Sequence, residues 1–132
     1  MKTLVVAAAI AGVMAASGVS QAGQMVSPMI FGSGEQVGAE CAVLNGGTAA
    51  IPVTIKIIDD FGSTVSTSNC GPVTPGEFCS HFSPIDNAEA HACIVTSVAS
   101  VQNLRGSLLV SKQIIDDFGL RQLQLIRVAP LH

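Results

Sequence analysis

The chain has 132 residues, of which 48% are hydrophobic and only 11% are charged, and its formal net charge is −3. A mildly acidic protein is a poor partner for nucleic acid and for anionic membrane surfaces. The sequence contains no Trp and no Tyr. It therefore lacks the aromatic residues with a polar handle that many sugar-binding and base-stacking sites use, and binding by that route is disfavoured.

Residues 1–22 have the organisation of a secretory signal peptide. Lys2 supplies a positive charge, a run of small and apolar residues follows, and Ser20 and Ala22 occupy the positions of a small-residue cleavage site. A transmembrane anchor would need about 20 apolar residues, and the run is broken from Gly18 onward. We therefore expect cleavage after Ala22, export to the periplasm or the exterior, and no stable membrane anchor.

Removal of 22 residues from 132 leaves 110, which is enough for one domain. We expect residues 23–34 to form a flexible N-terminal segment and residues 35–132 to form the domain. Val53, Ile55 and Ile57 alternate with polar residues, so a strand would place all three on one face.

Similar segments rich in Val, Ile, Thr and Ser, separated by Gly and Pro, predict strands along the whole exported chain. The expected strands are a ragged one near Met25–Phe31, then Cys41–Val43, Val53–Ile57, Ser63–Ser68, Glu77–Ser83, Glu89–Val98, Gly106–Ile115 and Leu120–Val128. About seven short strands at this spacing predict an all-β fold, a single antiparallel β-sandwich that is immunoglobulin-like and is preceded by the signal-peptide helix.

A six-residue repeat links two parts of the chain, because Ile57–Gly62 and Ile114–Gly119 share the sequence Ile-Ile-Asp-Asp-Phe-Gly. Each copy lies where one strand ends and another begins. We interpret both as hairpin turns, in which Asp accepts bonds from local backbone and Gly supplies a positive φ. A cation site is the alternative, but calcium-loop spacing is absent. Its ligands would be Asp59, Asp60, Asp116 and Asp117.

The four cysteines, Cys41, Cys70, Cys79 and Cys93, all lie in the exported part, where an even number indicates disulfides. Cys70 and Cys79 bracket a Gly- and Pro-rich loop that can turn back on itself, so we predict that they pair. Cys41 and Cys93 then remain, each in an apolar strand, as expected for a bridge through the core. Pairing of Cys79 with Cys93 and Cys41 with Cys70 stays open, because a hairpin over residues 84–88 would oppose Cys79 and Cys93.

The same hairpin would place His81 opposite His91, and two imidazoles with a carboxylate such as Glu89 could bind a transition metal. The simpler interpretation is that both histidines are exposed polar residues on one sheet face. We predict no metal site and no cofactor.

Several short segments between Cys41 and Val110 form a recognisable pattern, namely Cys41–Asn45, Val53–Ile55, Asp60–Gly62, Asn69–Cys70, Pro75–Gly76 with Cys79, Ala92–Val95 and Asn103–Leu108, which contains an Asn-Leu-Arg-Gly motif. On these segments the chain resembles a group of small exported β-sandwich proteins of proteobacteria. The resemblance implies export and a sandwich fold and brings no activity with it.

No pattern of catalytic residues is present, since a G-x-S-x-G nucleophile turn does not occur. We expect Arg105 to donate to loop carbonyls rather than to hold an anionic ligand. The protein is therefore predicted to be not an enzyme but a structural or binding protein of the cell envelope or exterior. An unknown protein partner fits this role, and we expect a monomer. The alternatives are a subunit of a strand-exchanging, pilin-like appendage and a metal-binding periplasmic protein.

Overall fold

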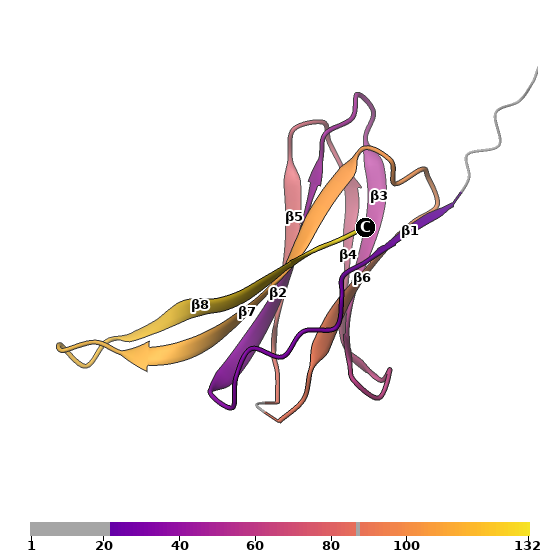
Figure 1. Cartoon of the computed structure of the whole chain (residues 1–132). Coiled ribbons are helices and arrows are strands. Elements are labelled where there is room, and N and C mark those ends of the chain that lie inside the picture. The colour runs from indigo at the N-terminus through magenta and orange to yellow at the C-terminus, as the bar shows by residue number, and fades with distance from the viewer. Residues whose placement is uncertain (1–21, 87) are drawn as a thin grey trace, which may run out of the picture.

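The computed structural model describes residues 22–86 and 88–132, and every regular element within them is a strand (Figure 1). The strands are β1 (Gly23–Val26), β2 (Gln36–Asn45), β3 (Ile51–Asp59), β4 (Thr64–Val73), β5 (Phe78–Pro84), β6 (His91–Ser97), β7 (Leu104–Ile115) and β8 (Arg121–Pro130). The predicted signal peptide lies outside the described residues except for Ala22.

The strands form two four-stranded sheets with the orders β1-β6-β3-β4 and β5-β2-β7-β8, and every pairing is antiparallel. The sheets pack face to face, which confirms the predicted antiparallel β-sandwich. Where about seven strands were expected, eight are present. The eighth is the ragged N-terminal strand, which the structure shortens to β1.

The central strands pair with each other as they do in the immunoglobulin fold. In that fold, strands B and E pair in one sheet, strands C and F pair in the other, and a disulfide joins B to F. Here β2 pairs with β5, β3 pairs with β6, and a disulfide joins β2 to β6. The flanking strands differ, because β7 lies beside β2 where the fold has strand A, and β1 lies beside β6 where it has strand G.

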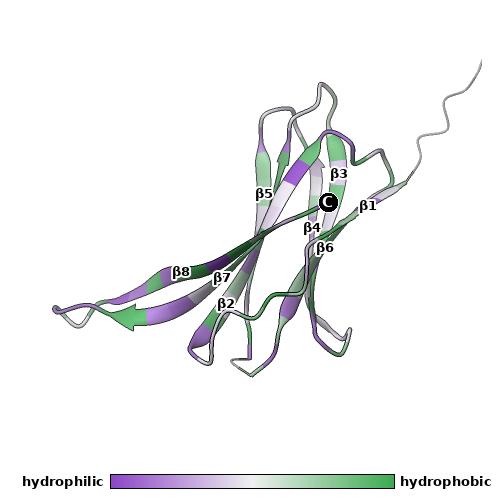
Figure 2. Ribbon diagram, in the orientation of Figure 1, coloured by the Kyte–Doolittle hydropathy of each residue, from purple (hydrophilic) through white to green (hydrophobic). Residues whose placement is uncertain are grey.

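The core lies between the two sheets and is built from the inward side of each strand. Ile55 and Ile57 are fully buried and Val53 nearly so, as their alternation predicted. Leu108 and Val110 of β7 bury their side chains from the opposite sheet. In Figure 2 hydrophobic residues are frequent along the strands of the sandwich, and they alternate with hydrophilic ones along the projecting part of β7 and β8.

Both predicted disulfides are present and both join the two sheets. Cys41 of β2 pairs with Cys93 of β6 inside the core, and Cys70 of β4 pairs with Cys79 of β5 at one side of the sandwich. Their sequence separations of 52 and 9 residues correspond to about 4 and about 2.6 kcal/mol in a chain-entropy model. The alternative pairing is wrong, because β5 pairs with β2 and β6 with β3, so no β5–β6 hairpin forms.

Two buried amide side chains hold the loops at opposite ends of β2. The Asn45 side chain donates to the carbonyls of Ala49 and Val73 and accepts from the Gly47 amide, so it holds the connection that follows β2. At the other end, the Gln36 side chain donates to the carbonyls of Asp86 and Glu89. Both amides are almost completely buried, so these bonds satisfy groups that would otherwise destabilise the fold.

The segment 23–34, which was expected to be flexible, contributes to the sandwich. Its first four residues form β1, and the Ile30 amide and carbonyl exchange hydrogen bonds with those of His91. The Ser27 hydroxyl accepts a hydrogen bond from the Cys93 amide at 2.9 Å. These contacts attach the segment to β6 because β6 offers it a free edge.

Candidate interaction surface

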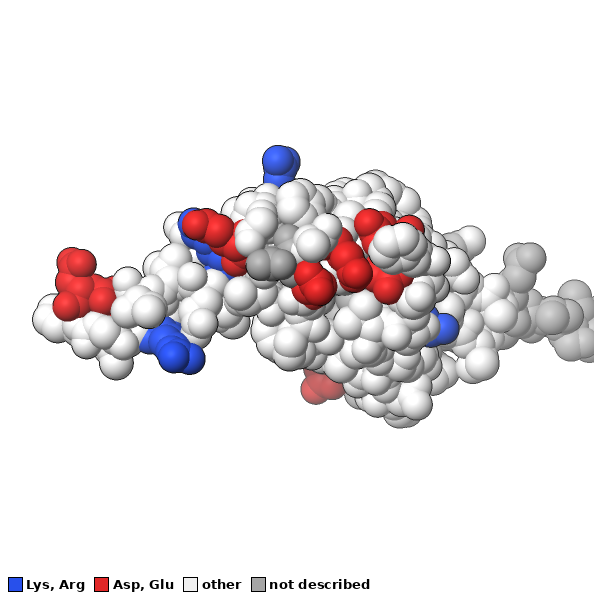
Figure 3. All heavy atoms as spheres, turned by 90° about the horizontal axis from the view of Figure 1, so that it is seen from below, with Lys and Arg blue, Asp and Glu red and all other residues white. Residues whose placement is uncertain are grey.

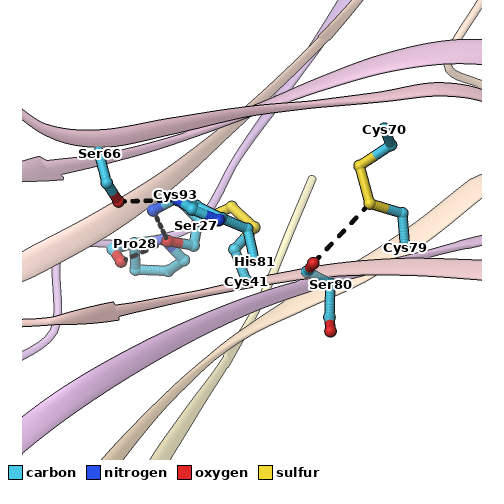
Figure 4. The surroundings of a disulfide bond; sticks show 9 residues. All are labelled: Ser27, Pro28, Cys41, Ser66, Cys70, Cys79, Ser80, His81 and Cys93. Atoms are coloured by element: carbon cyan, nitrogen blue, oxygen red, sulfur yellow. Dashed lines mark hydrogen bonds between the residues drawn. A yellow bond between two sulfur atoms is a disulfide. The ribbon is translucent and has the colours of Figure 1, made fainter.

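The two candidate histidines lie in different sheets and do not form a pair. His81 is on the inward side of β5, where its Nε2 atom lies 2.9 Å from the Ser66 hydroxyl of β4 (Figure 4). This contact crosses between the sheets on the same side as the Cys70–Cys79 disulfide. His81 thus helps to join β4 to β5, and it is partly rather than fully exposed.

His91 is almost completely buried at the start of β6, directly opposite Asp59 of β3 in the sheet register. Its Nδ1 atom is buried without a hydrogen-bond partner. The interpretation of both histidines as exposed residues on one sheet face is therefore wrong, because they lie in different sheets, His81 is only partly exposed and His91 is buried. Its backbone amide and carbonyl exchange hydrogen bonds with those of Ile30 in the N-terminal segment.

The repeated hexapeptides form two turns with the same geometry. In the first, the Asp59 carboxylate accepts from the amides of Phe61 and Ser63 at 3.0 and 2.7 Å. In the second, the Asp116 carboxylate accepts from the amides of Phe118 and Leu120 at 3.0 and 2.8 Å.

The closing glycines, Gly62 and Gly119, have φ values of 79° and 78°. The hairpin-turn interpretation is confirmed. The two turns lie far apart, at the ends of the β3–β4 and β7–β8 hairpins (Figure 1), so the four aspartates do not meet.

Two further observations concern the remaining charged residues. Across residues 22–86 and 88–132, no three His, Cys, Asp or Glu side chains gather closely enough to hold a metal ion. Arg105 donates to the carbonyls of Gln102 and Leu104 at 2.8 and 2.7 Å, as expected for a residue that stabilises a loop.

The outward face of the β5-β2-β7-β8 sheet carries large apolar side chains that none of the described elements covers. On β5, Cys79, His81 and Ser83 point into the sandwich, while Phe78 and Phe82 point outward and are exposed. The apolar side of this strand is thus its solvent side. Leu123, Leu125 and Val128 of β8 are 59%, 51% and 54% exposed.

Cross-strand register brings these side chains together. Phe82 lies opposite Glu40, Glu40 opposite Leu109, and Leu109 opposite Val128, which makes one row across all four strands. The next row along the sheet ends in Leu125, opposite Ser111. Hereafter the apolar face denotes Phe82, Leu109, Leu123, Leu125 and Val128.

A shallow hollow of about 180 Å³ lies in this face, lined by Glu40, Phe82, Leu109, Ser111, Leu123 and Leu125. Gly38 leaves the space that the Phe82 ring occupies beside this hollow. A Cβ atom on Gly38 would lie 2.4 and 2.5 Å from ring atoms of Phe82, so the phenyl ring covers the bare glycine backbone. An aromatic ring packed over a strand glycine is a known way to stabilise a sheet, and here it also forms one wall of the hollow.

The β7–β8 hairpin extends past the sandwich as an arm, defined here as residues 113–124 (Figure 1). The arm begins level with Gln36, the first residue of β2, because Lys112, opposite Gln36, is the last β7 residue with a β2 partner. Lys112 donates a hydrogen bond of 2.8 Å to the Glu35 carboxylate. This bond and the ammonium charge hold the pKa of Glu35 below its usual value.

Charges are segregated along the arm. Its turn carries the acidic residues Asp116 and Asp117. The charged residues of β8 are both basic, Arg121 within the arm and Arg127 beyond its base. Figure 3 shows the acidic side chains at the far end of the arm and basic side chains nearer the sandwich.

The outward face of the other sheet is polar by comparison. Thr54 of β3 lies between Thr96 and Asn69, and its hydroxyl bonds to the Asn69 side chain at 2.8 Å. Lys56 lies between Ile94 and Thr67 in the next row. The two outer faces of the sandwich therefore differ in chemistry, and only one presents a broad apolar surface.

The apolar face was not predicted from the sequence. The available signal was the presence of Leu123, Leu125 and Val128 in a segment that also contains Gln122, Gln124 and two arginines. No protein-family model, curated protein or solved structure matches the chain. Within the described residues, no helix has the length and hydropathy needed to span a membrane.

Proposed function

We propose that the protein is a non-catalytic, exported binding or structural protein of the bacterial cell envelope or exterior, and that the apolar face is its binding surface. The exposure of Leu123, Leu125 and Val128 on one continuous sheet face carries this proposal. Apolar patches of this kind on folded domains mark interaction sites more often than chance exposure does.

The two disulfides support the compartment. Disulfides form and persist in oxidising environments such as the periplasm and the cell exterior, and all four cysteines are paired. Together with the predicted signal peptide in residues 1–22, they favour export. The same bridges fix β4 to β5 and β2 to β6, which gives the apolar face a rigid support.

A subunit of a strand-exchanging surface appendage is a second candidate. One feature favours it, namely that β8 is a long edge strand with apolar side chains. An added strand from another protein would extend the same sheet.

Site-specific photocrosslinking in the exporting cell tests the proposal. A photoreactive residue at Leu125 should form covalent adducts with a bound protein, while one at Thr67, exposed on the polar outer face, should not. Equal labelling at both positions, or none at Leu125, would contradict the assignment of the apolar face. A regular ladder of adducts would favour the appendage subunit.

The predicted signal-peptide cleavage has a test of its own. The intact mass of the chain recovered from the cell should correspond to a first residue at Gly23.

A further inference from the structure

β8 is the long edge of its sheet that nothing in the described structure covers. The edge strands β4 and β5 are joined to each other by the Cys70–Cys79 disulfide, and β1 is only four residues long. β8 runs over Arg121–Pro130, and its backbone pairs only with β7. A long edge strand with free backbone groups is a template for pairing with another strand.

The outer half of β8 contains few of the residues that normally prevent such pairing, since Arg121 is its only charged residue. Arg121–Leu125 has the sequence Arg-Gln-Leu-Gln-Leu, with no Pro, no Lys and no acidic residue. Its odd-numbered residues lie on the side of the apolar face and its glutamines on the other side. This stretch is therefore suited to continue a sheet rather than to end one.

We propose that the occupant of this edge is a second copy of the chain, paired through an antiparallel β8–β8 contact whose two-fold axis passes through Leu123. The proposal goes beyond the binding role assigned above to the apolar face, because the contact uses the strand edge beside that face and leaves most of the face open. In this register Leu123 faces the partner's Leu123, Gln122 faces the partner's Gln124, and Leu125 faces the partner's Arg121. Two sheets of four strands then become one sheet of eight, and the apolar face continues from one copy to the next.

Charge selects the direction of the pairing. A parallel, in-register pairing would oppose arginine to arginine and acidic turn to acidic turn, and like charges directly opposite destabilise a sheet. The antiparallel pairing centred on Leu123 would place the turn with Asp116 and Asp117 level with the stretch of the partner's β8 that contains Arg127, so the acidic tip of each arm would lie near a basic residue.

Sedimentation equilibrium of the exported chain, with its disulfides intact, tests the contact. Twice the monomer mass is expected for the native chain, and the monomer mass for the Leu123→Lys, Leu125→Lys double variant. Thr67→Lys, which adds the same charge to the exposed polar face, should remain dimeric. Unchanged circular dichroism would show that the variants are folded.

A charge exchange sharpens the test of the register. Asp117→Lys and Arg127→Asp should each weaken the dimer, and the two together should restore it, because the pair is then reversed rather than removed. Neither side chain takes part in the turn hydrogen bonds, which use Asp116.

Three results would overturn the proposal. These are a native chain that stays monomeric up to millimolar concentrations, a dimer that survives the double lysine variant, and an open ladder of larger assemblies. If the chain is monomeric but the Leu125 crosslinker captures a different protein in the cell, the binding role of the apolar face stands and only the second copy is excluded.

Discussion

The two copies of Ile-Ile-Asp-Asp-Phe-Gly provide a comparison within one molecule. Both form the same turn, in which an aspartate accepts hydrogen bonds from two backbone amides and the glycine has a φ of 79° or 78°. Their surroundings differ completely. Ile57 of the first copy is fully buried, whereas Ile114 of the second is only partly buried and Ile115 is 69% exposed.

The difference comes from the strand on the other side. β6 pairs with β3 as far as Asp59, so the first hairpin is covered to its turn, while β2 stops pairing with β7 at Lys112. When the repeats are aligned, Lys112 stands where β3 has the fully buried Ile55. A turn is thus specified by its own residues, and burial is specified by neighbours far away in the sequence.

Truncation of the first isoleucine in each copy should give the largest contrast. Ile57→Ala removes a fully buried side chain and should cost about 2–5 kcal/mol of unfolding free energy. Ile114→Ala should cost about 1 kcal/mol or less, because the surrounding space is open to solvent. Urea unfolding of the two variants measures both values. Equal losses would mean that Ile114 is as buried in solution as Ile57 and would contradict the comparison.

Substitution of the two turn glycines should instead give equal effects. Gly62→Ala and Gly119→Ala meet no atom within 4 Å, so only the positive φ opposes them, at about 1–2 kcal/mol each. Gly34→Ala is the matched control, since that position is equally open and does not have a positive φ. It should leave stability nearly unchanged or raise it slightly. Thermal unfolding that showed a large difference between Gly62→Ala and Gly119→Ala would contradict the local origin of the turn.

The smallest effect concerns the ion pair at the base of the arm. The pKa of Glu35 is lowered in the folded state by Lys112, so its contribution to stability is present above the ordinary value of 4.5 and is lost as pH falls through the folded-state pKa. The stability difference between the native chain and Glu35→Gln should therefore be small near neutral pH, vanish in acid and shrink with added salt. A difference that grew as the pH fell would have the wrong sign.

The sequence was sufficient for features encoded by neighbouring residues. Alternation predicted the strands, the Asp-Asp-Phe-Gly turns were identified correctly, and the spacing of Cys70 and Cys79 indicated the right disulfides. The sequence was not sufficient to predict which strands pair with each other. The connection from Pro84 to His91 could form a hairpin or cross between sheets, and period-two alternation is the same in both cases.

The sequence also did not reveal which side of β5 faces the core. The pattern Phe78-Cys79-Ser80-His81-Phe82 favours placing the phenylalanines inside. The Cys79 bridge to β4 reverses this, since a cysteine that joins two sheets must point between them. The apolar face follows from that constraint, and so it could not be recognised before the sheets were known.

The position of β1 has a consequence for how the chain folds. Gly23 pairs with Ser97, so the first strand has no sheet partner until β6 is available. β2 likewise needs β5 and β7. Pairings between such distant segments form slowly, because long loops must close before any contact rewards them. A chain synthesised from its N-terminus would therefore keep these early strands unpaired until the later ones are made, and Cys41 would lack its disulfide partner until Cys93 follows.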